Sequence, residues 1–290
     1  MFGRRRAAAR LNKLLDSLVR NEISITAHEA QGDGDILRSK FGGRPAVPEG
    51  FVWPCFEAAS YDGVTAVRPL SFLCQINLEE IREYDVEGLL PQAGLLLFFY
   101  EQETMRWGFD PEDAGCSRVF YFEDASVLRA AELPDELSEE YRVREYELSF
   151  AANRSYPSFE ELELYTDAED IDSEDYDGAV EAKGYALDPE RHKLLGYADL
   201  VQGEMLTECE EASRGLYSGN PESCKSTPAE VRNDIQKAAS DWVLLFQMTS
   251  IEGDGFELMF GDLGNVYFYI RRQELRERRF DGAWLVLQCG

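Results

Sequence analysis

Two stretches of the chain share one pattern of apolar and polar positions. In the first, Leu70 to Asn77 (LSFLCQIN) is followed by Gly94 to Tyr100 (GLLLFFY). In the second, Trp242 to Thr249 (WVLLFQMT) is followed by Gly264 to Ile270 (GNVYFYI). Short apolar runs rich in aromatic and branched residues, with turn residues around them, are typical of buried strands. The chain therefore carries an internal repeat of a strand pair.

This repeat predicts a pseudo-symmetric fold. Two related units that each bury one face usually bury them against each other. We therefore expect an α+β fold: a strand-rich, pseudo-duplicated single domain with twisted antiparallel sheets and peripheral helices. An N-terminal segment, 1–37, is expected to precede this domain, 38–290. Its halves are expected at about 38–122 and 193–288, with an acidic insertion between them at about 123–192.

Further strands and helices follow from the same kind of pattern. Arg118 to Phe122, Tyr141 to Phe150 and Trp284 to Gln288 are predicted to be strands. Asn77 precedes two acidic residues in the way that a helix N-cap does, which predicts a short helix to about Tyr84. Arg271 to Leu275 is the helix expected in the second half.

The segment 1–37 begins with an amphipathic helix. Leu11, Leu14, Leu15 and Leu18 recur at helical spacing, and the helix is rich in arginine and nearly free of acid. Such a helix suits a membrane surface or a targeting peptide. It also suits a terminal helix that packs on an acidic body, which is the simpler interpretation, and both remain open at this point.

The charge of the chain narrows the range of partners. Its 290 residues include 56 acidic and 29 basic residues, for a net charge of −27. A surface this negative repels phosphate backbones, so we expect no nucleic-acid partner. It favours a basic protein partner, or it simply keeps the protein soluble. With no long apolar run and six scattered cysteines, we expect a cytoplasmic protein with reduced thiols and no membrane partner.

The acidic insertion contains the nearest approach to a metal-binding loop. Asp170, Asp172, Glu174 and Glu181 occupy positions 1, 3, 5 and 12 of a calcium loop. Position 6 is Asp175, where the sharp turn of such a loop needs glycine. A solvated acidic run is the simpler interpretation. We therefore expect no metal and no cofactor, although calcium binding stays open as a hypothesis.

No catalytic signature is present. The chain has only two histidines, His28 and His192, and neither lies near a nucleophile motif. It lacks a phosphate-binding loop, a dinucleotide fingerprint and a nucleophile elbow. The glycines at 253–255 and 261–264 lie between strand-like runs, and they predict hairpin turns rather than phosphate loops.

Polar residues within the repeated strands are the best candidates for ligand contact. Gln75 matches Gln247, and Asn77 lies at the end of the first strand. Buried amides need hydrogen-bond partners, so these side chains either bond to the backbone or line a ligand groove where the halves meet. Asp262, in the turn before the last repeated strand, is the fourth candidate.

Six segments in fixed order resemble a known family. They are FGGRPAVPEGFVWP, PLSFLCQINLEEI, LLPQAGLLLFFY, WGFDPEDAG, LLGYADLVQGEM and LLFQMTSIEGDGFELMFGDLGNVYFYIRRQEL. Together they resemble the YwqG-like family of bacterial proteins, also known as the domain of unknown function DUF1963, over about residues 38–288. The resemblance implies a soluble protein of mixed helices and strands without an assigned activity, cofactor or catalytic residue. Some relatives are thought to accompany secreted-toxin systems.

These observations lead to two main functional hypotheses. The first is a protein-interaction module whose acidic surface binds a basic partner, in its narrowest form an immunity-type inhibitor of a basic toxin. The second is an enzyme or small-molecule binder that uses a groove between the two halves, near Gln75, Asn77, Gln247 and Asp262.

Overall fold

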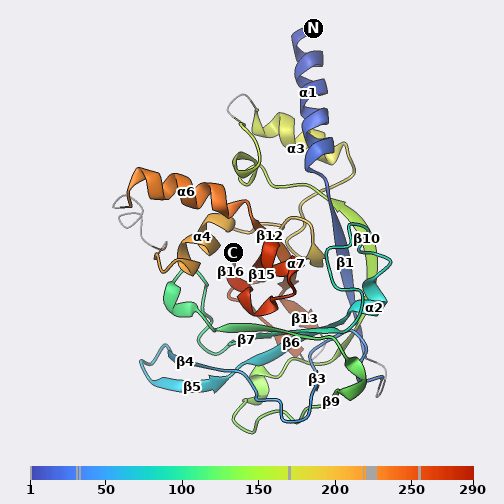
Figure 1. The fold of residues 1–290 in the computed structure, drawn as a ribbon, viewed down its shortest axis with the longest axis vertical. Helices are drawn as coiled ribbons and strands as arrows, with labels where there is room; N and C mark the ends of the chain where they lie inside the picture. The colour runs from blue at the N-terminus through green and yellow to red at the C-terminus, as the bar shows by residue number, and fades with distance from the viewer. Residues whose placement is uncertain are drawn as a thin grey trace.

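A computed structural model describes residues 2–30, 32, 34–168, 171–217, 219, 227–253 and 256–290, with the side chains of residues 2–7 left out. Its main feature is one antiparallel sheet in the order β16-β15-β12-β11-β1-β10-β2-β6-β7-β8 (Figure 1). The strands of this sheet are β1 (Arg20–Glu29), β2 (Lys40–Phe41), β6 (Ser71–Asn77), β7 (Leu95–Tyr100), β8 (Ser117–Phe122), β10 (Tyr146–Ser155), β11 (His192–Leu195), β12 (Trp242–Thr249), β15 (Asn265–Arg271) and β16 (Trp284–Gln288). The predicted α+β class with a twisted antiparallel sheet is confirmed.

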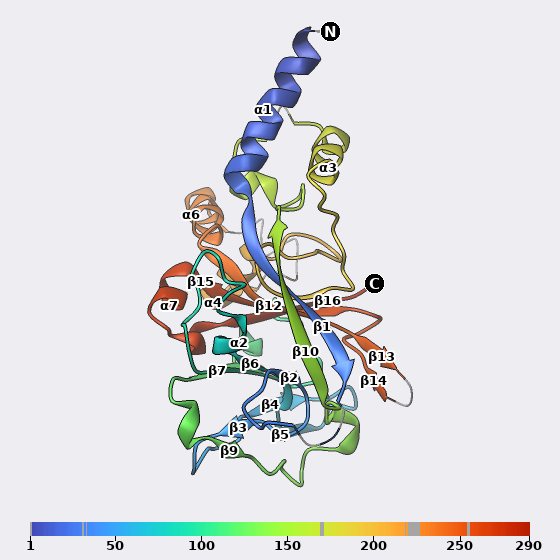
Figure 2. The same ribbon diagram turned by 90° about the vertical axis from the view of Figure 1, so that its right-hand side faces the viewer.

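The strand order is symmetric about the middle of the sheet. The long strands β1 and β10 pair from Arg20 opposite Ser155 to Glu29 opposite Tyr146 and cross the molecule side by side (Figure 2). β1 then pairs with β11, and β10 pairs with β2. The long strand that precedes each repeat in the chain thus pairs with a strand of the other repeat. Both long strands lie outside the repeats expected at 38–122 and 193–288, which continue outward as β2-β6-β7-β8 and β11-β12-β15-β16.

The repeated glycines have the same role in both halves. Gly94 precedes β7 and Gly264 precedes β15. A Cβ atom at Gly94 would collide with the carbonyl oxygen of Phe122, and one at Gly264 would collide with that of Gln288. Glycine is therefore required because the backbone of the neighbouring outer strand approaches too closely for a side chain.

The sheet curls so that its two halves pack face to face. Phe98 of β7 lies 4.6 Å from Phe246 of β12 and 5.2 Å from Phe268 of β15, measured between ring centroids. These rings belong to one apolar cluster that includes strands of both halves. Aromatic contacts of this geometry stabilise a core beyond the area that they bury.

Separate elements cover the outer faces of the two halves. Phe51 and Trp53, in the Gly- and Pro-rich loop, pack on the outer face of the first half, next to the short strands β3 (Ala46–Val47) and β9 (Arg129–Ala130). Helices α4 (Leu206–Ser213) and α6 (Ala229–Ala239) cover the second half. Two hairpins are formed by β4 (Cys55–Ala59) with β5 (Thr65–Pro69) and by β13 (Ile251–Gly253) with β14 (Phe256–Leu258).

The first helix points away from the body of the protein (Figure 1). Helix α1 (Phe2–Leu18) packs the predicted leucine stripe against α3 (Ser173–Glu181), and Lys183 Nζ lies 2.6 Å from Asp16 Oδ1. The acidic insertion is therefore partly helical. Asp172 is the N-cap of α3 and accepts hydrogen bonds from two backbone N–H groups. A calcium loop would need this stretch in a loop conformation, and its first position, Asp170, lies outside the described residues.

The predicted strands of both repeats are confirmed, and both predicted short helices form, but the two helices do not occupy equivalent positions in the two halves. Helix α2 (Leu78–Ile81) follows the first repeated strand of the first half, with Asn77 as its predicted N-cap. Helix α7 (Arg272–Arg276) follows the second repeated strand of the other half. The hairpin expected around Gly253 forms, with its tip at 254–255 outside the described residues. Within the described part of the chain, every helix is too short or too polar to cross a membrane.

Candidate functional site

The two repeated glutamines occupy equivalent, fully buried positions in separate halves. Gln75 Oε1 accepts from the backbone N–H of Ala46 at 2.8 Å, and Gln247 Oε1 accepts from that of Asp199 at 2.9 Å. The amide nitrogens donate to the carbonyl oxygens of Arg38 and Arg191 at 2.8 and 2.9 Å. Each glutamine thus fixes the loop that covers its own half.

Asn77 has a comparable role. Its Nδ2 donates to the carbonyl oxygen of Leu37 at 3.1 Å, and its Oδ1 caps α2 by accepting from Glu79 N at 3.0 Å. The structure therefore brings Gln75 and Asn77 together on one strand and places Gln247 on the corresponding strand of the other half. The contact between the halves is filled by Phe98, Phe246 and the residues around them, which leaves no groove at these aromatic rings.

A second repeated segment precedes each of these glutamines and was not identified from the sequence. It reads DILRSKFGG at 35–43 and DPERHKLLG at 188–196, which share Asp, Arg, Lys and Gly at equal spacing. The conformations agree as well, since the Asp35 and Asp188 carbonyls accept from the N–H groups of Arg38 and Arg191. The D-x-x-R-x-K-x-x-G spacing is the sequence signal that could have identified it.

Each copy places an arginine and a lysine against a glutamate at a central strand: Glu145 directly precedes β10, and Glu22 lies on β1. In the first half, Lys40 Nζ lies 3.1 Å from Glu145 Oε2, and the Glu145 side chain is 29% exposed. In the second half, Lys193 Nζ lies 3.1 Å from Glu22 Oε2 and 2.6 Å from Asp199 Oδ2. The side chains of Lys193, Glu22 and Asp199 are all completely buried.

The pKa values of the two lysines shift in opposite directions because the second half has one more acidic residue beside its lysine. Asp199 occupies the position that Ala46 has in the first half, because the backbone N–H of each residue donates to the equivalent glutamine of its half. Burial lowers the pKa of Lys40 below its usual range. Burial would also lower the pKa of Lys193, but Asp199, Tyr185 and Glu22 outweigh that effect and raise it.

The outer face of the second half continues this difference. By strand register, Asn265, Tyr267 and Gln288 occupy the positions of Leu95, Leu97 and Phe122. The Tyr267 hydroxyl donates to the carbonyl oxygen of Asp199 at 2.7 Å, and Asn265 Nδ2 donates to that of Pro189 at 2.8 Å. The two halves have therefore diverged, and only the second carries a buried polar layer at these positions.

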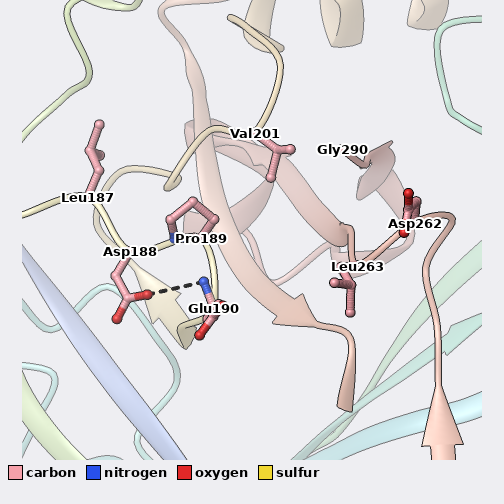
Figure 3. Close-up of a pocket in the computed structure, with 8 residues that line it drawn as sticks. All are labelled: Leu187, Asp188, Pro189, Glu190, Val201, Asp262, Leu263 and Gly290. Carbon is pink, nitrogen blue, oxygen red and sulfur yellow. Dashed lines mark hydrogen bonds between the residues drawn. The ribbon is translucent and has the colours of Figure 1, made fainter. Parts of the chain in front are cut away.

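A surface hollow of about 420 Å³ lies beside this polar layer, and we call it the acidic pocket (Figure 3). Its floor is tied to the layer, because Asn265 bonds to Pro189 and Gln288 Oε1 accepts from Val201 N at 3.1 Å. Asp262, the fourth candidate from the sequence, lines it. The lining residues are Leu187, Asp188, Pro189, Glu190, Val201, Asp262, Leu263 and Gly290.

The lining of the acidic pocket has three carboxylates and no basic side chain. Asp188, Glu190 and Asp262 are all exposed. Asp188 Oδ1 accepts from Glu190 N at 3.2 Å, and Asp188 Oδ2 is 3.8 Å from Arg191, outside the pocket. Leu187 and Leu263 supply exposed apolar surface. Carboxylates around apolar walls suit a basic group on an aliphatic stem.

The three carboxylates line the hollow without converging on one point. Among the residues that the structure describes, no three His, Cys, Asp or Glu side chains are grouped closely enough to hold a metal ion. The partly buried His192 is held in a structural hydrogen bond, since its Nδ1 accepts from Thr249 N at 3.2 Å. Burial lowers the pKa of His192 to about 4, which suits this acceptor role.

Comparison with known proteins identifies a family whose function is unknown. The family described as "Domain of unknown function (DUF1963)" matches residues 39–289, which include every strand from β2 to β16. No curated protein matches the chain.

Proposed function

This chain belongs to the DUF1963 family, and we propose that it is a cytoplasmic binding module for a basic protein partner. The observation that carries the proposal is the lining of the acidic pocket, where Asp188, Glu190 and Asp262 stand without a basic side chain. The net charge of −27 supports it, because a field of this sign draws a basic partner toward the surface.

The proposed contact is a lysine or arginine side chain of the partner in the acidic pocket. Its aliphatic stem would lie along one of the apolar walls, Leu187 or Leu263, and its charged group would meet one of the carboxylates that line the hollow. Charge-assisted hydrogen bonds are stronger than neutral ones, so a few such contacts can determine which segment is bound. The surrounding negative surface would mainly raise the association rate.

Neutralising the pocket should weaken binding more than neutralising the surface elsewhere. The probes are lysine- or arginine-containing octapeptides and their glutamine counterparts, followed by fluorescence polarisation. The double variant Glu190→Gln/Asp262→Asn is expected to weaken binding of the basic peptides about tenfold, which corresponds to about 1.4 kcal/mol. It removes the local charges that would pair with the basic group.

The matched control is Asp135→Asn/Glu139→Gln, which removes the same two residue types from exposed positions outside the pocket. Its net charge equals that of the pocket variant, so a general field effect would weaken both equally. We expect the control to change the dissociation constant less than twofold. Equal weakening in the two variants, or equal binding of the glutamine peptides, would refute the assignment of the pocket.

An immunity-type inhibitor of a basic toxin is the narrower form of this proposal. An acidic inhibitor of a basic nuclease gains a fast encounter and competes with the nucleic-acid substrate for the same positive surface. The test is the activity of a panel of basic nuclease toxins with the chain added in equimolar amount. Protection by the wild type that is lost with Glu190→Gln/Asp262→Asn would support this role, and no protection against any toxin would count against it.

A further inference from the structure

A second hollow, of about 400 Å³, lies between the tip of the β4–β5 hairpin, the loop that follows β7 and the segment after α4. We call it the aromatic pocket. It combines segments that lie far apart in the sequence, and it shares no lining residue with the acidic pocket. The lining residues are Ala59, Ser60, Tyr61, Thr104, Met105, Arg106, Trp107, Phe109, Asp110, Asp113 and Tyr217.

The long wall of this pocket is held by β7 and by the end strand β16. The Tyr100 hydroxyl donates to the carbonyl oxygen of Arg106 at 2.8 Å. Trp284 Nε1 donates to that of Gly108 at 2.7 Å, and the backbone of Leu287 donates to that of Trp107 at 3.0 Å. A wall fixed in this way is pre-formed, so a ligand does not have to order it.

Aromatic side chains remain exposed around the pocket. Tyr61 is 87% exposed and Tyr217 is 43% exposed, while Trp107 and Phe109 are partly buried. The rings of Phe109 and Tyr217 lie 5.8 Å apart. Exposed aromatic groups gathered at one hollow are typical of recognition sites, and the negative faces of such rings attract cations.

The charges at the pocket also favour a cation. Arg106 makes two contacts within the protein: its Nη2 donates to the carbonyl oxygen of Ala59 at 3.2 Å, and its Nε, which makes no hydrogen bond, lies 3.9 Å from Asp113 Oδ1. Asp113 is in turn bonded to Gly108 N at 2.9 Å. Asp110 caps the following turn through Oδ1, which leaves its other oxygen for a ligand.

We infer that the aromatic pocket binds an arginine side chain that is presented by the basic partner, an inference that rests on the proposed function. A planar guanidinium stacks on aromatic rings and pairs with a carboxylate at the same time, which the compact ammonium of lysine does less well. Tyr61, Phe109 and Tyr217 supply the rings, and Asp110 supplies the carboxylate. The partner then has two contacts, one in each pocket.

The probe for this inference is the tripeptide Ac-Gly-Arg-Gly-NH2, followed by the NMR signal of the Trp107 indole N–H. The citrulline tripeptide, which has nearly the same shape without the charge, is the control ligand. We expect a saturable shift with the arginine peptide, and at least fivefold weaker binding of the citrulline peptide. The lysine peptide should bind more weakly than the arginine peptide.

Variants separate this site from the acidic pocket. Tyr61→Ala and Asp110→Asn are each expected to weaken binding of the arginine tripeptide at least threefold, and Glu190→Gln/Asp262→Asn should leave it unchanged. Tyr61 is almost fully exposed, so its truncation should not impair folding. Equal binding of the citrulline peptide, or an unchanged affinity in Tyr61→Ala, would overturn the inference. If basic octapeptides still depend on the acidic pocket in that case, the proposed function itself stands.

Discussion

Replacing Lys193 by methionine is expected to lower the free energy of unfolding by about 3–5 kcal/mol, because it leaves a carboxylate buried without its cation. Lys193 Nζ lies 2.6 Å from Asp199 Oδ2 and 3.1 Å from Glu22 Oε2, and all three side chains are fully buried. Methionine fills a similar volume, so the loss would report the charge rather than a cavity. Urea denaturation followed by circular dichroism at pH 7 measures it.

The pseudo-symmetry of the fold supplies an internal control. Lys40 occupies the equivalent position in the first half, but its partner Glu145 is 29% exposed and also lies 2.9 Å from Arg38 Nη2. Glu145 would still be paired with Arg38 and partly hydrated, so Lys40→Met is expected to lower the free energy of unfolding by only about 1 kcal/mol.

A second substitution tests the cause of the loss at Lys193. Adding Asp199→Asn to Lys193→Met removes the orphaned charge, while Arg191 still neutralises Glu22 at 3.0 Å. We expect this double variant to recover at least half of the lost free energy. Similar losses in Lys193→Met and Lys40→Met, or no recovery in the double variant, would show that the buried charge is not the cause.

The sequence predicted the outer parts of the sheet better than its centre. The repeated strands are apolar on both faces and end at glycines that the fold requires, so their pattern is strong. β1 (Arg20–Glu29) and β10 (Tyr146–Ser155) contain many polar residues and pair chiefly with each other. The predicted strand at Tyr141 to Phe150 overlaps β10, whereas β1 carries no clear alternation. Their role follows from long-range pairing, which local patterns do not encode.

Some features of the candidate site could likewise be predicted from the sequence, and others could not. Matching Gln75 with Gln247 from the sequence located equivalent positions correctly, but both side chains hold backbone in place. The difference between the halves at Ala46 and Asp199 follows once the two D-x-x-R-x-K-x-x-G segments are aligned, and the strand register gives the same alignment. Pockets depend on which loops meet, as when Tyr61 and Tyr217 line one hollow, and no spacing within either loop predicts that meeting.

Replacing Glu161 by glutamine is expected to stabilise the protein at alkaline pH and to change the pH dependence of its unfolding. Glu161 is 1% exposed. Burial and the nearby Glu204 raise its pKa from 4.5 to about 8, although Ser158 N, Arg20 and Lys193 act in the opposite direction. The folded protein therefore keeps a proton on this carboxyl that the unfolded chain releases above about pH 4.5.

The sign of the effect follows from this proton. Between pH 4.5 and about 8 the folded state binds more protons at Glu161 than the unfolded state does, so stability falls as the pH rises and then levels off. A neutral glutamine removes this contribution. Relative to the wild type, Glu161→Gln should gain about 2–4 kcal/mol between pH 5 and pH 8.5, since one pKa unit corresponds to about 1.4 kcal/mol and the linkage is seldom fully realised.

Urea denaturation of both proteins at pH 5, 6.5 and 8.5 measures this difference. The control is Glu208→Gln, because burial and Glu204 also raise the pKa of Glu208, but only to about 7. Its gain should be smaller and should be complete at lower pH than that of Glu161→Gln. Parallel pH profiles for the wild type and Glu161→Gln would mean that Glu161 is ionised in the folded protein. In that case the positive charges of Arg20 and Lys193 would stabilise the ionised carboxylate, although it is buried among Tyr165, Tyr197 and Tyr269.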